Sequence, residues 1–269
     1  MPYTSDSHEY EELLNKYPKA IKVLAEGDSW LAYPRRFFAL GPAANIVQVL
    51  GKKKKYVIYT KADNGDEALA MMSGEQKLSF SQRMKYNWFD VIIFSGGGND
   101  IVGRYDFDFF IGDRSDHPNH LDCIRIKRLE DKLLQIKLAY REMLERVREY
   151  SVNPDIVVVS HVYDFITPSR KGFAVFDLIP LGDSWLYPFL KRKGYENSEE
   201  QAEMINFMLR RFREVLLQLQ VEYEGLFYVA ETQGLLNKNQ WRNEIHPTPE
   251  GFKVITKAIE GKVKDALNR

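Results

Sequence analysis

The chain has 269 residues, of which 44% are hydrophobic and 13% aromatic, enough to bury one large core. Its 38 basic residues balance its 38 acidic ones, so its formal net charge is zero. A chain without net positive charge has no overall electrostatic attraction to nucleic acid or to an anionic membrane surface. We therefore expect a single domain over residues 1–269 and no nucleic-acid partner.

The cysteine content and the N-terminal segment indicate the compartment. Because Cys123 is the single cysteine, the chain cannot form an intramolecular disulfide. The absence of disulfides is typical of proteins in reducing compartments. Residues 1–10 are polar and acidic where a signal peptide has a basic start and an apolar core, and no apolar run approaches the roughly 18 to 20 residues of a membrane span. We expect a cytoplasmic protein without a stable membrane anchor, and the sequence leaves its oligomeric state open.

Short apolar segments alternate with longer segments of helical periodicity. Five runs rich in β-branched and aromatic residues are typical of strands buried on both faces: 21–25, 56–60, 91–94, 156–159 and 226–230. Helical periodicity marks four other stretches: 38–50, 126–150, 198–220 and 249–267. This alternation predicts an α/β fold, a three-layer α/β/α sandwich around a flavodoxin-like, five-stranded parallel sheet in the order 2-1-3-4-5.

Two segments fit this scheme least well. Residues 101–122 and 163–197 are rich in aromatics, proline, glycine and charge but lack a sustained period. Long connections of this kind in compact domains are often lids or binding loops. We expect two lid-like insertions over one edge of the sheet that select the substrate, with ordered surface packing as the alternative.

Three short motifs occur in the order that a serine hydrolase needs. They are Gly27-Asp28-Ser29-Trp30, Ser95-Gly96-Gly97-Gly98-Asn99-Asp100 and Asn243-Glu244-Ile245-His246-Pro247. In the predicted strand order, Ser29, Gly65 and Asn99 each follow the carboxyl end of one of three adjacent strands, where open α/β sheets bind their ligands. A serine hydroxyl needs a neutral histidine to take its proton. We expect Ser29 to be the nucleophile and His246, which directly precedes the last helix, to be the general base.

These motifs resemble the SGNH hydrolases, also called the GDSL esterases and lipases. In that family the nucleophile lies in a Gly-Asp-Ser block, matched here by Gly27, Asp28 and Ser29, with Trp30 replacing the commonest leucine. The Gly-x-Asn-Asp block is matched at residues 97–100, and the resemblance implies that the Asn99 side chain donates to the oxyanion. The backbone N–H groups of Gly65 and Ser29 complete the implied oxyanion hole.

The last block departs from the family pattern. The family has Asp-x-x-His, whereas this chain has Asn243 three residues before His246. An asparagine oxygen can accept from Nδ1 and orient the ring, as in papain-like proteases. We expect a Ser-His-Asn triad or a dyad, with Glu244, a backbone carbonyl or a distant carboxylate as alternative partners of the ring.

A second copy of the first motif competes with it. The stretch Gly182-Asp183-Ser184-Trp185-Leu186-Tyr187-Pro188 repeats the pattern of residues 27–34. Ser184 lies in the second irregular segment and downstream of Asn99, so the family order favours Ser29. We expect Ser184 to be a helix cap or a lid contact.

Other side chains are candidates for substrate contact. We expect Trp30, Gly98, His161 and Trp185 to bind substrate, although His161 also suits an aromatic wall or a structural hydrogen bond. An apolar acyl pocket has seven aromatic candidates: Tyr33, Phe37, Phe107, Phe109, Phe110, Trp185 and Tyr187.

We expect neither a metal nor a cofactor. The glycine run 96–98 lacks the Lys-Ser/Thr pair of a phosphate-binding loop. The polar residues Asp113, Asp116, His117, His120, Asp122 and Cys123 fit no strong metal signature. The predicted function is a serine esterase or acylhydrolase on a small acyl ester, and the alternatives are a weak or silent binding protein of the same fold and an acyltransferase.

Overall fold

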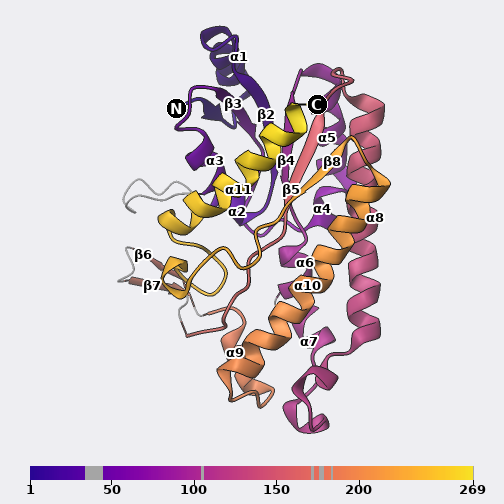
Figure 1. The fold of residues 1–269 in the computed structure, drawn as a ribbon, viewed down its shortest axis with the longest axis vertical. Helices are drawn as coiled ribbons and strands as arrows, with labels where there is room; N and C mark the ends of the chain where they lie inside the picture. The colour runs from indigo at the N-terminus through magenta and orange to yellow at the C-terminus, as the bar shows by residue number, and fades with distance from the viewer. Residues whose placement is uncertain (34–44, 104–105, 171–172, 176–178, 183, 269) are drawn as a thin grey trace.

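The computed structural model describes residues 1–33, 45–103, 106–170, 173–175, 179–182 and 184–268. Within these residues six parallel strands form one sheet (Figure 1): β1 (Tyr3–Thr4), β2 (Ile21–Gly27), β3 (Tyr56–Thr60), β4 (Val91–Ser95), β5 (Val157–His161) and β8 (Phe227–Ala230). Their order is β1-β3-β2-β4-β5-β8, so the five predicted strands stand in the predicted order. The predicted number of strands was too small, because the sheet also contains β1 at its edge beside β3. A strand of only two residues shows no periodicity from which it could be predicted.

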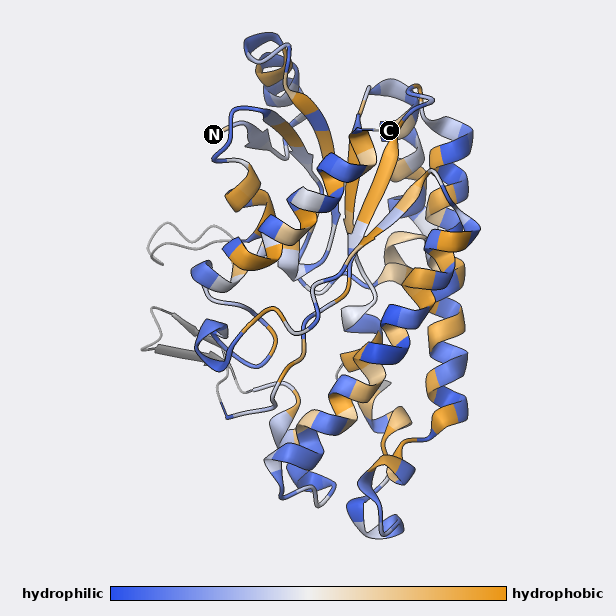
Figure 2. Cartoon of the chain, in the orientation of Figure 1, coloured by the Kyte–Doolittle hydropathy of each residue, from blue (hydrophilic) through white to orange (hydrophobic). Residues whose placement is uncertain are grey.

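Helices cover both faces of the sheet and make the predicted three-layer sandwich (Figure 1). On one face α3 (Ile46–Leu50) packs against α11 (Pro249–Leu267). On the other face lie α5 (Gly74–Tyr86), α8 (Ile126–Tyr150) and α10 (Ser198–Glu222). Figure 2 shows apolar strands in the middle and helices whose outer sides are hydrophilic, as a buried central sheet requires.

The long helices match their predicted positions closely. Helices α8 and α11 have the predicted bounds, and α10 continues two residues beyond its predicted end. Helix α3 begins at Ile46 after an Asn45 cap, and residues 38–44 of that prediction lie outside the described residues. Helices α1 (Ser7–Lys16) and α5 were not predicted: α1 is short and buries one residue, Tyr10, and α5 has only a weak apolar stripe.

The two irregular segments contain short elements of their own. The first holds α6 (Gly98–Val102), α7 (Asp106–Phe110) and two 3-10 turns, Arg114–Asp116 and His120–Cys123. The second holds an antiparallel pair, β6 (Phe173–Val175) and β7 (Ile179–Gly182), followed by α9 (Tyr187–Arg192). In the part of the chain that the structure describes, no helix is long and apolar enough to cross a bilayer.

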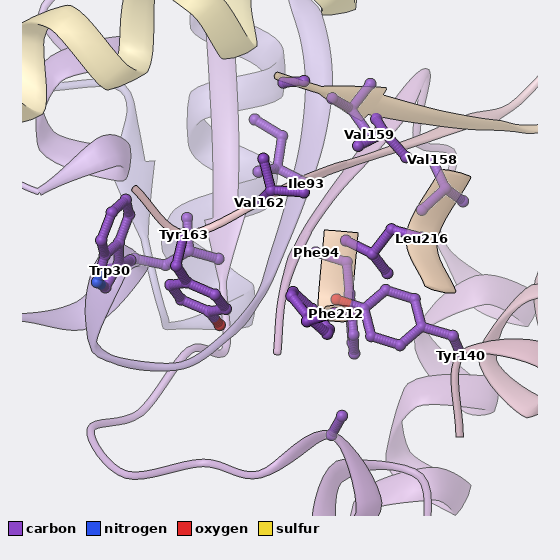
Figure 3. Close-up of a cluster of buried hydrophobic side chains, with 14 of the residues drawn as sticks. Trp30, Ile93, Phe94, Tyr140, Val158, Val159, Val162, Tyr163, Phe212 and Leu216 are labelled. Atoms are coloured by element: carbon purple, nitrogen blue, oxygen red, sulfur yellow. The ribbon is translucent and has the colours of Figure 1, made fainter. Parts of the chain in front are cut away.

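The glycine run after β4 packs on the buried aromatic cluster that includes Tyr140 and Phe212, and Figure 3 shows these two side chains. Tyr140 of α8 donates its hydroxyl to the carbonyl oxygen of Gly96 at 2.8 Å. Gly97 has φ 102°, and a Cβ there would lie 2.5 Å from the ring of Phe212. Only glycine combines this backbone conformation with so close a contact. The core thereby fixes the path of the chain into α6, which begins with Gly98 and Asn99.

Candidate active site

Ser29 lies just after the central strand β2. The turn that leads to it requires a glycine at position 27. Gly27, the last residue of β2, has φ 149°, and a Cβ there would lie 2.2 Å from the carbonyl oxygen of Ser95. Asp28 then caps α2 (Ser29–Ala32), accepting from the backbone N–H of Trp30 at 3.0 Å. Ser29 is the first residue of that helix and is 8% exposed.

The structure brings Ser29, His246 and Asn243 together. The Nε2 atom of His246 lies 2.8 Å from Ser29 Oγ, and its Nδ1 atom lies 3.2 Å from Asn243 Oδ1. Asn243 Oδ1 also accepts from the backbone N–H groups of Ile245 at 3.1 Å and of His246 at 2.8 Å. These two bonds fix the orientation of the amide, so Nδ1 must be the donor and Nε2 is left to accept from the serine hydroxyl.

Neighbouring aromatic groups hold the histidine loop. The indole N–H of Trp30 donates to the carbonyl oxygen of Ile245 at 3.1 Å, linking the serine turn to the histidine loop. The ring of Tyr33 stacks on that of His246, with centroids 4.1 Å apart and planes at 12°.

His246 is 2% exposed, and burial, with a contribution from the nearby Arg242 cation, lowers its pKa to about 3. The imidazole is therefore neutral near pH 7, as a general base must be.

Hydrogen bonds join the loops that follow β2, β3 and β4. The backbone N–H of Asp28 donates to Ser95 O at 3.0 Å, and that of Asp63 donates to Gly27 O at 2.9 Å. The side-chain amide of Asn99 donates to the carbonyl oxygen of Asp66 at 2.9 Å. Gly65 lies in the same turn with φ 88°, a left-handed conformation that favours glycine. The expected oxyanion residues Gly65 and Asn99 thus belong to two loops that are bonded together.

Asp100 adds hydrogen bonds between the loop after β4 and the loop after β3. Its carboxylate is fully buried and accepts from the backbone N–H groups of Ala68 at 2.7 Å and Leu69 at 3.2 Å. These groups are at the start of α4 (Ala68–Met71), just after the Gly65 turn. Asn99 and Asp100, which are adjacent in the sequence, therefore both hold the loop that follows β3.

A buried polar network that the sequence analysis did not identify lies beside the serine turn. Ser95 donates its hydroxyl to Asp28 Oδ1 at 2.7 Å and lies 2.9 Å from His161 Nε2, while Tyr163 donates to Asp28 Oδ2. Burial raises the pKa of Asp28 to about 6, against the opposing effect of the bonds from Tyr163 and Ser95, and burial lowers that of His161 to about 4. The available sequence signal was position, since Ser95 and His161 end strands at the same sheet edge as Ser29.

Three residues expected to bind substrate lie in or against this buried region. His161 is 1% exposed and Trp30 is 3% exposed, and their rings stack with centroids 5.1 Å apart. Gly98 packs so closely on Tyr163 that a Cβ would lie 2.7 Å from its ring. The bond from His161 to Ser95 and its stacking on Trp30 agree with the two alternatives given for His161, a structural hydrogen bond and an aromatic wall.

Glu244 faces a different segment from Asn243. Its carboxylate is 3% exposed and accepts from four backbone N–H groups, those of Ser169 at 3.0 Å, Tyr187 at 2.8 Å, Leu186 at 2.9 Å and Trp185. Both oxygens of the Glu244 carboxylate accept bonds from that segment, so Glu244 is not the group that orients the His246 ring. The geometry favours Asn243 among the partners that the sequence left open.

The second copy of the motif forms the turn that Glu244 binds. Asp183 lies outside the described residues, and Ser184 is partly exposed before α9. Trp185 is 39% exposed, and its indole N–H donates to the carbonyl oxygen of Val102 at 2.7 Å, at the end of α6. This copy therefore connects the histidine loop to the helix that carries Asn99.

The remaining candidate residues are scattered. Phe107 and Phe110 are buried in the core, and Phe109 is exposed beneath the Arg128 guanidinium. Tyr187 accepts from Arg170 at 3.2 Å, and Phe37 lies outside the described residues.

Among the described residues, no group of three or more His, Cys, Asp and Glu side chains is arranged to hold a metal ion, and His120 pairs with Glu203 at 2.8 Å.

Comparison with known proteins identifies the fold. No family model and no curated protein matches the chain. Solved structures do match it, among them three that align over nine-tenths of the chain or more. A lipase from a goat rumen metagenome is 16% identical with a TM-score of 0.57, covering 90% of this chain and 97% of that chain. A Geobacillus acetyl-xylooligosaccharide esterase is 14% identical with a TM-score of 0.51, covering 91% and 95%. A member of the lipolytic G-D-S-L family from Veillonella parvula is 10% identical with a TM-score of 0.52, covering 90% and 97%. The chain therefore has the fold of the SGNH, or GDSL, hydrolases that its motifs resemble.

Proposed function

We propose that this protein is a serine hydrolase that cleaves a small acyl ester through an acyl-enzyme on Ser29. The observation that carries the proposal is the chain of contacts from Ser29 Oγ to His246 Nε2 at 2.8 Å and from Nδ1 to Asn243 Oδ1 at 3.2 Å. A nucleophile, a base and a group that orients the base are the minimum that acyl transfer requires.

The reaction follows from these contacts. His246 Nε2 takes the hydroxyl proton of Ser29 as Oγ bonds to the acyl carbon. The tetrahedral intermediate collapses when the bond to the alcohol oxygen breaks, and His246 returns the proton to the departing alcohol. Water then attacks the acyl-enzyme and gives a proton to His246. When the Ser29 ester bond breaks, Oγ recovers that proton and the carboxylic acid leaves.

The loops after β2, β3 and β4 supply the oxyanion hole in this proposal. The donors are the side-chain amide of Asn99 and the backbone N–H groups of Gly65 and Ser29. Removing one such donor typically costs about 100- to 1000-fold in kcat. The bonds between these loops prearrange the donors, because Asn99 is held to Asp66 and Asp100 to Ala68 and Leu69.

We further propose that residues 1–269 act as one domain and that the segments 101–122 and 163–197 shape the substrate site. Support comes from Trp185, whose backbone is bound by Glu244 and whose indole is bound to Val102 at the end of α6. The low exposure of Ser29 and His246 suits a small acyl group. A Geobacillus protein with this fold is an acetyl-xylooligosaccharide esterase, which agrees with an acetyl-sized acyl group.

Hydrolysis of p-nitrophenyl acetate, butyrate and octanoate by wild type, Ser29→Ala and Ser184→Ala tests this function. We expect Ser29→Ala to lower kcat/KM at least about 1000-fold and Ser184→Ala to change it little, with acetate preferred. Absence of Ser29-dependent turnover would point to a binding protein. Acyl transfer to added alcohols in preference to water would identify an acyltransferase.

A further inference from the structure

The position of Ser29 depends on the carboxylate of Asp28, the residue before it. Asp28 is 2% exposed and caps α2 through the backbone N–H of Trp30, so the orientation of its carboxylate sets the first turn of that helix. Its Oδ1 atom accepts from Ser95, the last residue of β4, at 2.7 Å, and its Oδ2 atom accepts from Tyr163, just after β5. The turn of the nucleophile is thereby held to the next two strands of the sheet.

The Tyr163 side chain also supports the loop of Asn99. A Cβ at Gly98 would lie 2.7 Å from Tyr163 Cζ and 3.0 Å from both Cε atoms, so the backbone before Asn99 rests on the end of the ring that carries the hydroxyl. The ring is packed edge-on against Trp30, with centroids 5.2 Å apart, and tilted against Phe212 at 5.8 Å (Figure 3). Burial raises the pKa of Tyr163 well above its usual value, so the hydroxyl keeps the proton that it donates. One side chain therefore contacts both loops.

We propose that Tyr163 is a positioning residue that sets the separation between Ser29 and Asn99. This inference rests on the proposed function. In that reaction the oxyanion forms once Ser29 Oγ has bonded to the acyl carbon, and the Asn99 amide must then lie within hydrogen-bond distance of it. The nucleophile and this donor belong to different loops, so a contact that both loops share fixes their relative position. Tyr163 acts through Asp28 and Gly98 and does not touch the reacting atoms.

Tyr163→Phe keeps the ring and removes its hydroxyl bond to Asp28, so that the ring no longer holds the two loops together. We expect kcat for p-nitrophenyl acetate to fall about 10- to 30-fold while KM stays within about 2-fold, because the displaced groups act together only in the transition state.

Tyr223→Phe is the matched control for the loss of a buried tyrosine hydroxyl. Tyr223 and Tyr163 are both 6% exposed, and Tyr223 also donates to a carboxylate, that of Glu145, at 2.7 Å. It lies at the end of α10 just before β8, at the amino edge of the sheet, and should leave kcat within about 2-fold of wild type. Equal kcat in the Tyr163→Phe and Tyr223→Phe proteins would overturn the inference.

A double-mutant cycle with Asn99→Ala separates positioning from a general loss of structure. If Tyr163 acts by placing Asn99 relative to Ser29, its hydroxyl has little to contribute once the Asn99 amide is gone. Tyr163→Phe should therefore lower kcat by no more than about 3-fold in the Asn99→Ala protein. An equal fold-loss in both backgrounds would show that Tyr163 only stabilises the fold, and would overturn the inference.

Hydrogen exchange tests the inference without any ester. The backbone N–H of Trp30 reports on the serine turn and that of Ile101 on α6, because each is hydrogen-bonded within its element. In Tyr163→Phe both should exchange at least about 10-fold faster than in wild type, while the N–H groups of α11 are unchanged. Unchanged exchange at either position would overturn the inference. Faster exchange at both, in a protein whose wild type shows no Ser29-dependent turnover, would contradict the proposed function alone.

Discussion

Asn243 stands where the family pattern has an aspartate, and its side chain is neutral rather than charged. Its Oδ1 atom accepts from the backbone N–H groups of Ile245 and His246 and from Nδ1 of the ring, so one oxygen holds both the loop and the tautomer. What a neutral amide cannot supply is charge stabilisation of the imidazolium. In the proposed reaction Asn243 therefore orients the base without adding a negative charge beside it.

The pH dependence of kcat/KM follows from the burial of His246. Burial and the nearby Arg242 lower its pKa to about 3, so the ring remains neutral and able to act as a base well below the usual histidine range. We expect kcat/KM for an uncharged ester to stay level from about pH 7.5 down to about pH 5, measured with enzyme shown to be folded at each pH. A fall centred near pH 6.5 would mean that the ring is solvated and the site more open than the structure shows.

At the scale of elements, the Glu244 carboxylate joins the histidine loop to the segment that contains α9. It gathers four backbone N–H groups, and the next link is the bond from the Trp185 indole to Val102 at the end of α6. These bonds connect the loop of the base to the helix of Asn99. Because a displacement of about 1 Å can cost roughly 100-fold in rate, the connection bears on activity as well as stability.

Trp185→Phe tests this connection with a matched control. The change removes one indole hydrogen bond and retains an aromatic ring. Trp88→Phe likewise removes an indole hydrogen bond, the more exposed one to Asp90 at 3.1 Å, just before the amino end of β4. Trp185→Phe should lose about 1 kcal/mol of unfolding free energy in denaturant titrations, and Trp88→Phe no more than that, because its bond is exposed. Only Trp185→Phe should also lower kcat/KM, by about 5- to 10-fold. Equal kcat/KM in the two variants would refute the connection.

Helix α11 is tied to the sheet by an ion cluster that includes two lysines just before β3. Glu260, whose side chain is 7% exposed, pairs with Lys53 and with Lys55 at 2.6 Å and accepts from Tyr56 at 3.2 Å. The lysines are 44% and 43% exposed, so water screens the attraction. Burial alone would raise the pKa of Glu260, but the two ammonium groups lower it to about 2.

We expect Glu260→Gln to lower the free energy of unfolding by about 1 kcal/mol at pH 7. Because the folded-state pKa is depressed, the contribution of the carboxylate is present above the ordinary value of 4.5 and is lost as the pH falls toward 2. Denaturant titrations should therefore show the difference between wild type and variant shrinking through that range. A difference that is unchanged at pH 3 would contradict the ion-pair account.

At the scale of the whole molecule, the strand order gathers the site. The sheet places β3, β2 and β4 side by side, so the loops that carry Gly65, Ser29 and Asn99 leave the same edge, and the chain returns after β8 to bring His246 over Ser29. This convergence was predictable, because it depends only on buried strands, their order and the positions of short motifs.

Other features were not predictable, for physical reasons. The partners of Glu244 and the network around Ser95 depend on contacts between residues more than 50 positions apart, which no local pattern encodes. The strand β1 is two residues long, and α1 is polar on most of its surface. The sequence predicted that His246 would meet Ser29, but not that Tyr33 would stack on its ring.

The measurement that tests the account most directly is the mass and site of the adduct formed with a fluorophosphonate. The account predicts one phosphonyl group per chain, located by peptide mapping on Ser29, formed slowly in His246→Gln and not at all in Ser29→Ala. Labelling of Ser184, or no labelling of folded wild-type protein, would contradict the claim that Ser29 and His246 form the reacting pair.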